Sequence, residues 1–166
     1  NVIENKAFNH CKAKEIINAD SVDNILSAAF DNSVFYNKKV LKNQCVVIGH
    51  YLLKVDETAY RLEIPSNVES AYVNVHLNKV KEVVVHNLKI LECILDLSQK
   101  LIIAKDAPFF SKISKLKMKG LKYIDVEDGN PFYSSENGVL FTKNKKYLLK
   151  FPPGRTGLYK IPEGVN

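Results

Sequence analysis

The chain contains the sequence Tyr51-Leu-Leu-Lys54 followed by Ile64-Pro-Ser-Asn-Val68, and a near copy reads Tyr147-Leu-Leu-Lys150 followed by Ile161-Pro-Glu-Gly-Val165. A shorter repeat lies near the start, where the pairs Ala7-Phe8 and Ala29-Phe30 are 22 residues apart. Self-similarity at a period near 22 residues is typical of stacked repeats. A solenoid built from such repeats offers an extended surface rather than a pocket, so the pattern favours binding over catalysis.

Short β-branched segments recur along the chain, and they predict one strand in each coil. Leu62, Val83 and Ile124 are expected at equivalent positions, with a further strand between the last two. Because every coil returns to the same side, these strands are expected to form a parallel sheet. The predicted strands are residues 14–18, 60–64, 81–85, 100–104, 122–126 and 158–161.

Residues 3–8 and 25–30 each carry Ile and Phe five positions apart, with Ala beside the Phe. This spacing predicts a short helical or 3₁₀ return segment that turns one ring inward as core. The expected fold class is therefore an α/β solenoid, mostly β, with short helical or 3₁₀ returns.

Two longer segments, at about residues 35–55 and 130–151, exceed what a connector needs and contain paired β-rich runs. Gly49-His50 separates the runs of the first segment, and the polar residues 143–146 separate those of the second. Both tips suit hairpin turns, so two inserted β-hairpins are predicted. Residues 1–166 are expected to form a single repeat domain, as a section of a longer array.

Several of these motifs together resemble the BspA-like leucine-rich repeats. The matching stretches are Ala-Phe-x-x-Cys at residues 7–11, the two Ile-Pro-x-x-Val motifs, and residues 124–141 with 148–154, which include Asn130-Pro-Phe-Tyr-Ser-Ser. The resemblance implies a leucine-rich-repeat module that is secreted or displayed on the cell surface of a host-associated bacterium or parasitic protist. It also implies binding to proteins or host extracellular matrix, and it brings no catalytic or metal-binding residue.

Residues that point away from the core of the predicted strands form the candidate partner-binding face. They combine both charges with Tyr and Val, which suits a protein or glycan ligand better than a polyanion. An ordinary solvated sheet face is the alternative for each of them, and a structural spacer without its own ligand is the alternative function. The candidate residues are Glu15, Ile17, Arg61, Glu63, Glu82, Val84, Tyr123, Asp125 and Lys160.

The net charge of +6 comes mainly from dispersed lysines, with small clusters at residues 38–39, 112–119 and 143–146. Dispersed Lys is typical of a solubilising face. Arg, which recognises phosphate and guanine in a bidentate manner, occurs only at positions 61 and 155, so no nucleic-acid partner is predicted. Charged or polar residues interrupt each apolar run, so no membrane insertion is predicted.

The sequence offers no recognised catalytic or metal motif. Cys11, Cys45 and Cys93 are too widely spaced for a disulfide framework or a zinc knuckle, and the four histidines form no HExxH pattern. Asp125 and the acidic pair before Gly129 miss the spacing of a calcium loop and are expected to form a solvated turn. We therefore expect no enzyme activity and no cofactor.

Overall fold

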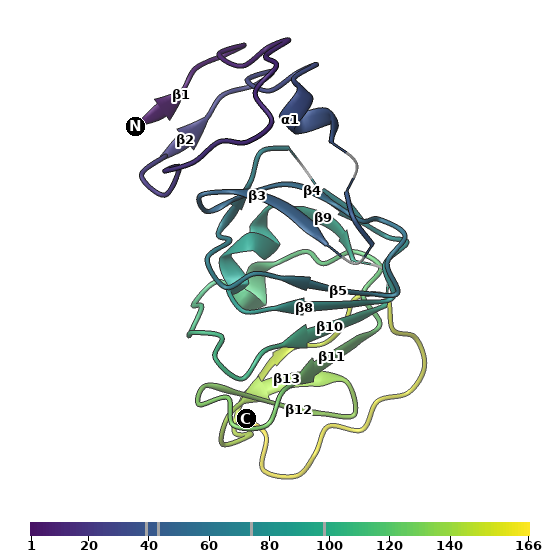
Figure 1. Cartoon of the computed structure of the whole chain (residues 1–166). Helices are drawn as coiled ribbons and strands as arrows, with labels where there is room; N and C mark the ends of the chain where they lie inside the picture. Colours follow the sequence, from purple (N-terminus) through teal and green to yellow (C-terminus); the bar gives the residue numbers. More distant parts are fainter. Residues whose placement is uncertain (39, 43, 74, 98) are drawn as a thin grey trace.

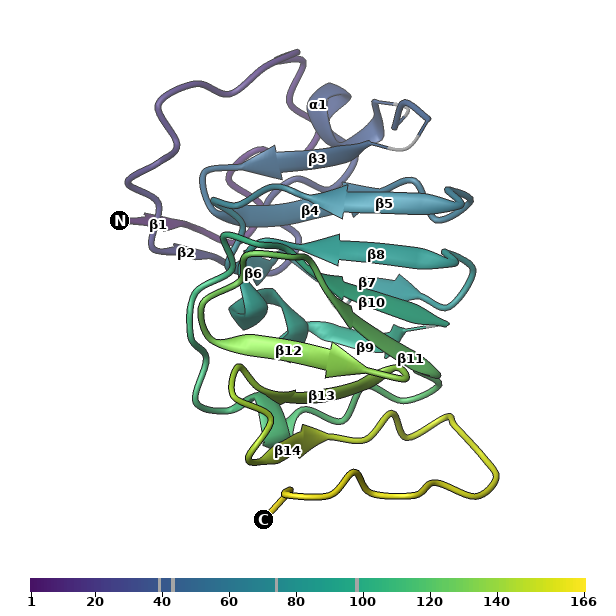
Figure 2. The same ribbon diagram turned by 90° about the horizontal axis from the view of Figure 1, so that it is seen from below.

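The computed structural model describes residues 1–38, 40–42, 44–73, 75–97 and 99–166. Its central feature is a four-stranded parallel sheet that follows the solenoid axis, with the two termini at opposite ends of the molecule (Figure 1). The strands lie in the order β5 (Arg61–Ile64), β8 (Glu82–Val85), β10 (Lys100–Ile103) and β11 (Tyr123–Val126). Figure 2 shows the same strands stacked one above another.

The register of this sheet matches the periodicity of the sequence. Leu62 pairs with Val83, Val83 with Leu101, and Leu101 with Ile124, so one residue of each coil occupies the same column. All four side chains are at most 1% exposed because alternate residues of each strand point into the coil. The predicted solenoid with a parallel sheet is confirmed.

A second set of short strands lies in the return parts of the coils. β4 (Tyr51–Val55) pairs in parallel with β6 (Ser70–Ala71), and β7 (Val75–Leu77) pairs in parallel with β9 (Ile94–Leu97). Two 3₁₀ helices follow on, η1 (Leu88–Glu92) after β8 and η2 (Ile113–Lys115) after β10. The fold is a mostly-β solenoid with little helix.

The first two coils pair through the two-residue strands β1 (Val2–Ile3) and β2 (Asn24–Ile25). In the turns that follow, backbone amides donate to the carbonyl three residues earlier in the chain. Lys6 and Ala28 have positive φ, however, so no helix forms there. The helical form predicted for residues 3–8 and 25–30 is therefore wrong. The predicted inward rings are present, since Phe8 and Phe30 stack with their centroids 5.5 Å apart and Phe30 is fully buried.

Residues 14–18 do not form the predicted strand. The following coil carries the helix α1 (Val34–Asn37) at this level, and the amide of Val34 donates to the carbonyl of Cys11. Ser33 starts that helix because its buried hydroxyl accepts from the Tyr36 amide. A strand needs a neighbouring ladder edge, and a helix supplies none.

Residues 158–161 do not form the predicted strand either. Leu158 is fully exposed, and Gly157 has a φ of +100°, which turns the chain away from the sheet. Among the described residues, 158–161 pair with no strand. A β-branched composition alone does not create a strand without a partner strand.

Antiparallel pairs occur in both of the longer segments. In the first, β3 (Cys45–Ile48) pairs with β4 around Gly49-His50, and β4 then takes part in the parallel pair with β6. In the second, β12 (Tyr133–Glu136), β13 (Val139–Thr142) and β14 (Leu148–Lys150) form a three-stranded meander. That these segments are insertions stays a prediction. Lys39 and Asn43, within 35–55, lie outside the described residues.

Two large clusters make up most of the hydrophobic core, and they meet at β4. The larger cluster fills the coils around β5, β8, β10 and β11 and includes Leu52. The smaller one fills the N-terminal coils around Phe30 and includes Tyr51 and Leu53. Because Leu52 and Leu53 are adjacent strand residues, their side chains point to opposite faces, and β4 joins the two clusters.

Candidate functional site

The outward residues of the four main strands form one continuous face, which we call the outer sheet face. Register places residues from neighbouring coils side by side on it, as in Glu63, Val84, Ile102 and Asp125. Each strand contributes alternate residues, since the others enter the core. The outer sheet face comprises Arg61, Glu63, Glu82, Val84, His86, Lys100, Ile102, Ala104, Tyr123 and Asp125.

Ion pairs between adjacent coils occupy one edge of this face. The Arg61 guanidinium lies 3.2 Å from a Glu82 carboxylate oxygen, and the Lys100 ammonium lies 3.1 Å from Asp125. Lys100 also lies 5.5 Å from the centroid of the Tyr123 ring. Exposed pairs of this kind contribute little to stability, so their main consequence is a face on which the charges are balanced.

The centre of the face is apolar and covered. Val84, Ile102 and Ala104 form their own small cluster, and Val84 is only 1% exposed. In the sheet register, Val84 lies between Glu63 of β5 and Ile102 of β10, and Glu82 and His86 lie two residues away from it along the chain. The predicted exposure of Val84 is therefore wrong, because Val84 packs with Ile102 and Ala104 of the neighbouring coil.

His86 lies between two carboxylates from different coils. Its Nε2 is 2.9 Å from Glu63, and its Nδ1 is 2.6 Å from Asp106, which follows β10. Burial lowers the pKa of His86, but the hydrogen bonds to Glu63 and Asp106 outweigh it, so the pKa lies above the ordinary value. Since a carboxylate only accepts, this geometry suits a protonated imidazole that donates from both nitrogens.

The meander β12–β14 closes the C-terminal edge of the main sheet. The amide of Ile124 donates to the carbonyl of Gly138, and the amide of Val126 donates to the Ser135 hydroxyl. The Ser135 hydroxyl also donates to Asp125. Burial raises the pKa of Asp125, but the bonds from Lys100 and Ser135 outweigh this effect and keep it below the ordinary value. Covering a strand edge in this way prevents uncontrolled strand addition.

A buried amide anchors the same end of the solenoid. The Asn130 side chain is fully buried, donates to the carbonyls of Ala104 and Ala107, and accepts from the amides of Phe132 and Tyr133. The two bonds that it donates tie this turn to the preceding coil, and the two that it accepts fix the local turn before β12. The sequence signal for this residue was the Asn-Pro-Phe-Tyr stretch, which gave no indication of the partners.

Five of the nine predicted contact residues lie together on the face with measurable exposure. Arg61, Glu63 and Tyr123 are exposed, while Glu82 and Asp125 are half-buried. Glu15, Ile17 and Lys160 are exposed but belong to segments that are not strands, so the structure does not bring them to this face. Lys100 and His86 were missed, although the strand register alone would have placed them there.

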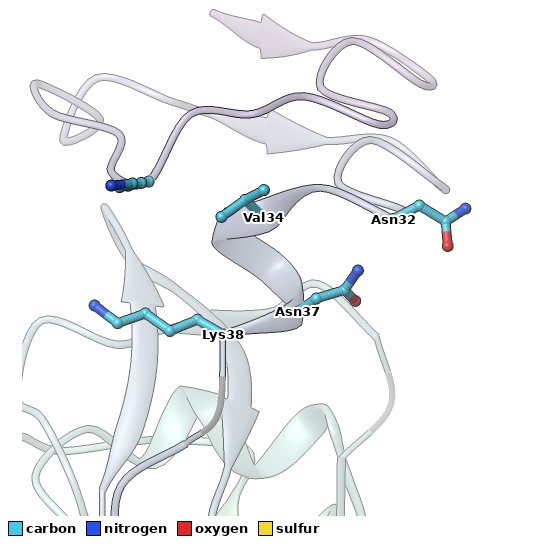
Figure 3. A pocket seen from close by; sticks show the side chains of 5 residues that line it. Asn32, Val34, Asn37 and Lys38 are labelled. Carbon is cyan, nitrogen blue, oxygen red and sulfur yellow. The ribbon is translucent and has the colours of Figure 1, made fainter.

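A hollow of about 500 Å³ lies beside α1, between the first two coils (Figure 3). It is lined by Lys14, Asn32, Val34, Asn37 and Lys38, all of them exposed. Ligand sites usually bury most of a ligand against apolar walls. With an exposed lining throughout, this hollow does not meet that description.

Neither a metal-holding group of side chains nor a membrane-spanning helix occurs in the part of the chain that the structure describes. No three His, Cys, Asp or Glu residues there are grouped to hold a metal ion. None of the described helices has both the length and the apolar character needed to cross a bilayer. Asp125 and Glu127, from the acidic turn considered for calcium, instead bind Lys100 and the amide of Lys105.

Comparison with known proteins finds two similar solved structures. The pneumococcal vaccine antigen PcpA is 22% identical, with a TM-score of 0.44 over 99% of this chain and 38% of that one. A leucine-rich repeat protein from Eubacterium ventriosum is 16% identical, with a TM-score of 0.35 over 64% of this chain and 42% of that one. The chain thus spans about two fifths of each protein, and both similarities are too weak to support a conclusion about function. No family model and no curated protein matches the sequence.

Proposed function

We propose that this chain is a noncatalytic recognition module of the leucine-rich-repeat type, related to the BspA-like repeats, that contacts a partner protein through its outer sheet face. The observation that supports this proposal most directly is the in-register parallel sheet, which presents one row of side chains from each of four coils. Solenoids use such continuous surfaces to bind other molecules. We further propose an extracellular or cell-surface location, with host matrix protein or glycan among the ligands.

The residues best placed for contact are at the two ends of the face. Arg61 and Glu63 are exposed on β5, and Tyr123 is 42% exposed on β11. Tyr and Arg are enriched among the residues that dominate binding energy at protein interfaces. Between them lies the buried apolar centre of the face, formed by Val84, Ile102 and Ala104.

The test is a double substitution, Arg61→Glu with Tyr123→Ala, followed by an unbiased pull-down from host matrix and surface proteins. Proteins that the unsubstituted chain captures should be lost by the variant. The melting temperature should change little, since an exposed ion pair contributes about 1 kcal/mol or less. If the variant captures the same proteins with unchanged affinity, the outer sheet face is not the contact surface.

One observation favours a structural spacer as the second candidate function. The charged residues of the face are paired within the chain, as in Arg61 with Glu82 and Lys100 with Asp125. Partner binding would have to replace or share these pairs. A pull-down that enriches no protein, from a chain shown to be folded, would favour the spacer.

A further inference from the structure

A groove separates the two 3₁₀ helices on a part of the coil that the outer sheet face does not include. It has a volume of about 440 Å³ and is lined by Leu91 and Glu92 of η1, Ile94 of β9, and the residues Lys112, Lys115, Leu116 and Lys117 around η2. Its size falls in the lower part of the usual range for ligand pockets, about 300–1,000 Å³. The groove is therefore large enough to accept a side chain of a bound segment.

The groove combines an apolar floor with a basic rim. Leu91, Ile94 and Leu116 are at most 7% exposed and lie among the lining residues, so the apolar surface is recessed. The lysines are exposed above it, and their aliphatic stems extend the apolar wall. An occupant must therefore carry an apolar group with negative charge beside it.

The charge balance of the rim is strongly positive. Lys112 pairs with Glu92 at 3.0 Å, and Glu92 is the single carboxylate among the lining residues. Neither Lys115 nor Lys117 forms an ion pair with any residue that the structure describes. Two unpaired ammonium groups two positions apart suit carboxylates on an extended chain, whose side chains recur at the same interval.

A neighbouring lysine holds the rim in place. The Lys150 ammonium of β14 donates to the carbonyls of Ser114 and Leu116 at the end of η2. Burial lowers the pKa of Lys150. The two hydrogen bonds from Lys150 hold the backbone that carries Lys115 and Lys117. This reduces the conformational entropy that the chain loses when a ligand binds.

We propose that the groove between η1 and η2 binds an extended acidic segment of a partner protein. One apolar side chain of that segment enters the floor at Leu91, Ile94 and Leu116, and flanking carboxylates pair with Lys115 and Lys117. This site goes beyond the proposed function, because none of its residues belongs to the outer sheet face.

A bilayer and a nucleic acid fit the groove less well. Membrane binding needs apolar side chains that protrude, whereas those of the groove are recessed. Single-stranded nucleic acid is held by exposed aromatic rings on which bases stack, and the lining contains none. An acidic peptide satisfies both the recessed floor and the basic rim.

The test uses a fluorescein-labelled probe peptide, Glu-Asp-Leu-Glu-Phe-Asp-Glu, with blocked ends, titrated with the full chain by fluorescence anisotropy. Lys115→Glu with Lys117→Glu should lower the affinity at least about tenfold, because each carboxylate then meets a like charge. Glu92→Gln should raise the affinity about threefold, because it frees Lys112 for the peptide. Added salt should weaken binding.

The matched control is Lys12→Glu with Lys14→Glu, which has the same spacing and the same change of charge in the first coil. This control should bind the peptide as the unsubstituted chain does. A peptide with Ser in place of Leu and Phe should bind at least about tenfold more weakly, since it lacks the apolar anchor. Methyl resonances of Leu91, Ile94 and Leu116 should shift on peptide addition.

Three results would overturn the proposal. Equal weakening by the Lys12/Lys14 control would show general charge attraction instead of a site. Undiminished binding of the Ser-containing peptide would exclude the apolar floor. Sedimentation with phosphatidylserine vesicles that is lost in the Lys115/Lys117 variant, without binding of the peptide, would identify a lipid headgroup site.

Discussion

At the scale of single residues, the hydrogen bonds of His86 to Glu63 and Asp106 make one contact of the fold sensitive to pH. The pKa of His86 is raised in the folded chain, whereas the pKa of an unfolded imidazole is about 6.5. The folded state therefore prefers the protonated form. The stabilisation is complete below about pH 6.5 and is lost as the pH rises through the higher folded pKa.

We accordingly expect His86→Gln to reduce the free energy of unfolding most at about pH 5.5 and progressively less toward alkaline pH. Urea unfolding of both proteins across this range measures the difference. In a background with Glu63→Gln and Asp106→Asn, the pH dependence of the difference should shrink, because the two carboxylates cause it. A difference that grows with pH would contradict the assignment.

The same scale shows where sequence reasoning about the site succeeded and failed. The alternation of side-chain direction along a strand correctly predicts that Leu62 lies in the core and Arg61 on the outer face. This period depends only on the backbone of the strand itself. The exposure of Val84 could not be obtained this way, since it depends on side chains from other coils. The lysines at residues 112–119 are typical of a solubilising face, but the buried Ile113, Leu116 and Met118 alternate with them, and of these three Leu116 belongs to the groove floor.

At the scale of elements, a segment of this chain forms a strand where a neighbouring strand can pair with it, and its amino-acid composition matters less. Residues 100–104 and 158–161 are similarly rich in strand-forming residues, but only the first segment finds ladder partners on both sides. Residues 14–18 meet α1 in the next coil, and a helix offers no edge to pair with. The solenoid and its register could be predicted from periodicity. That residues 14–18 and 158–161 form no strands could not, because it depends on what the neighbouring coils offer for pairing.

The turn between β12 and β13 provides a prediction at this scale. Gly138 has a φ of +75°, and a Cβ there would lie 2.4 Å from the Tyr123 ring. Gly138→Ala should therefore destabilise the chain by more than backbone strain alone, and loosen the cover of the β11 edge. Gly129→Ala is the matched control, because Gly129 has a φ of +91° and open space around it.

Thermal or urea unfolding should show that Gly129→Ala lowers the free energy of unfolding by about 1 kcal/mol, the cost of a left-handed non-glycine residue. Gly138→Ala should lower it by more. In a Tyr123→Ala background the excess should disappear, because the ring that causes the clash is absent. Equal costs for the two glycine substitutions would show that the Tyr123 ring moves aside freely.

At the scale of the whole molecule, two clusters joined at one strand imply that stability is not uniform along the solenoid. Each coil contacts mainly its neighbours, so repeat arrays open in parts. Leu52 packs into the larger cluster and Leu53 into the smaller one, and both are at most 1% exposed. The two residues are chemically identical and adjacent, which makes them a matched pair for separating the clusters.

Substitution of either leucine by alanine should cost about 2–5 kcal/mol, the usual range for a buried leucine. Leu53→Ala should speed hydrogen exchange in the N-terminal coils, as at the Phe8 amide bonded to Ala29, while the Ala104 amide bonded to Val85 stays protected. Leu52→Ala should lower protection at Ala104 instead, because that bond lies in the coils of the larger cluster. Hydrogen exchange measured by mass spectrometry distinguishes these patterns, and the same pattern in both variants would show that the coils unfold as one unit.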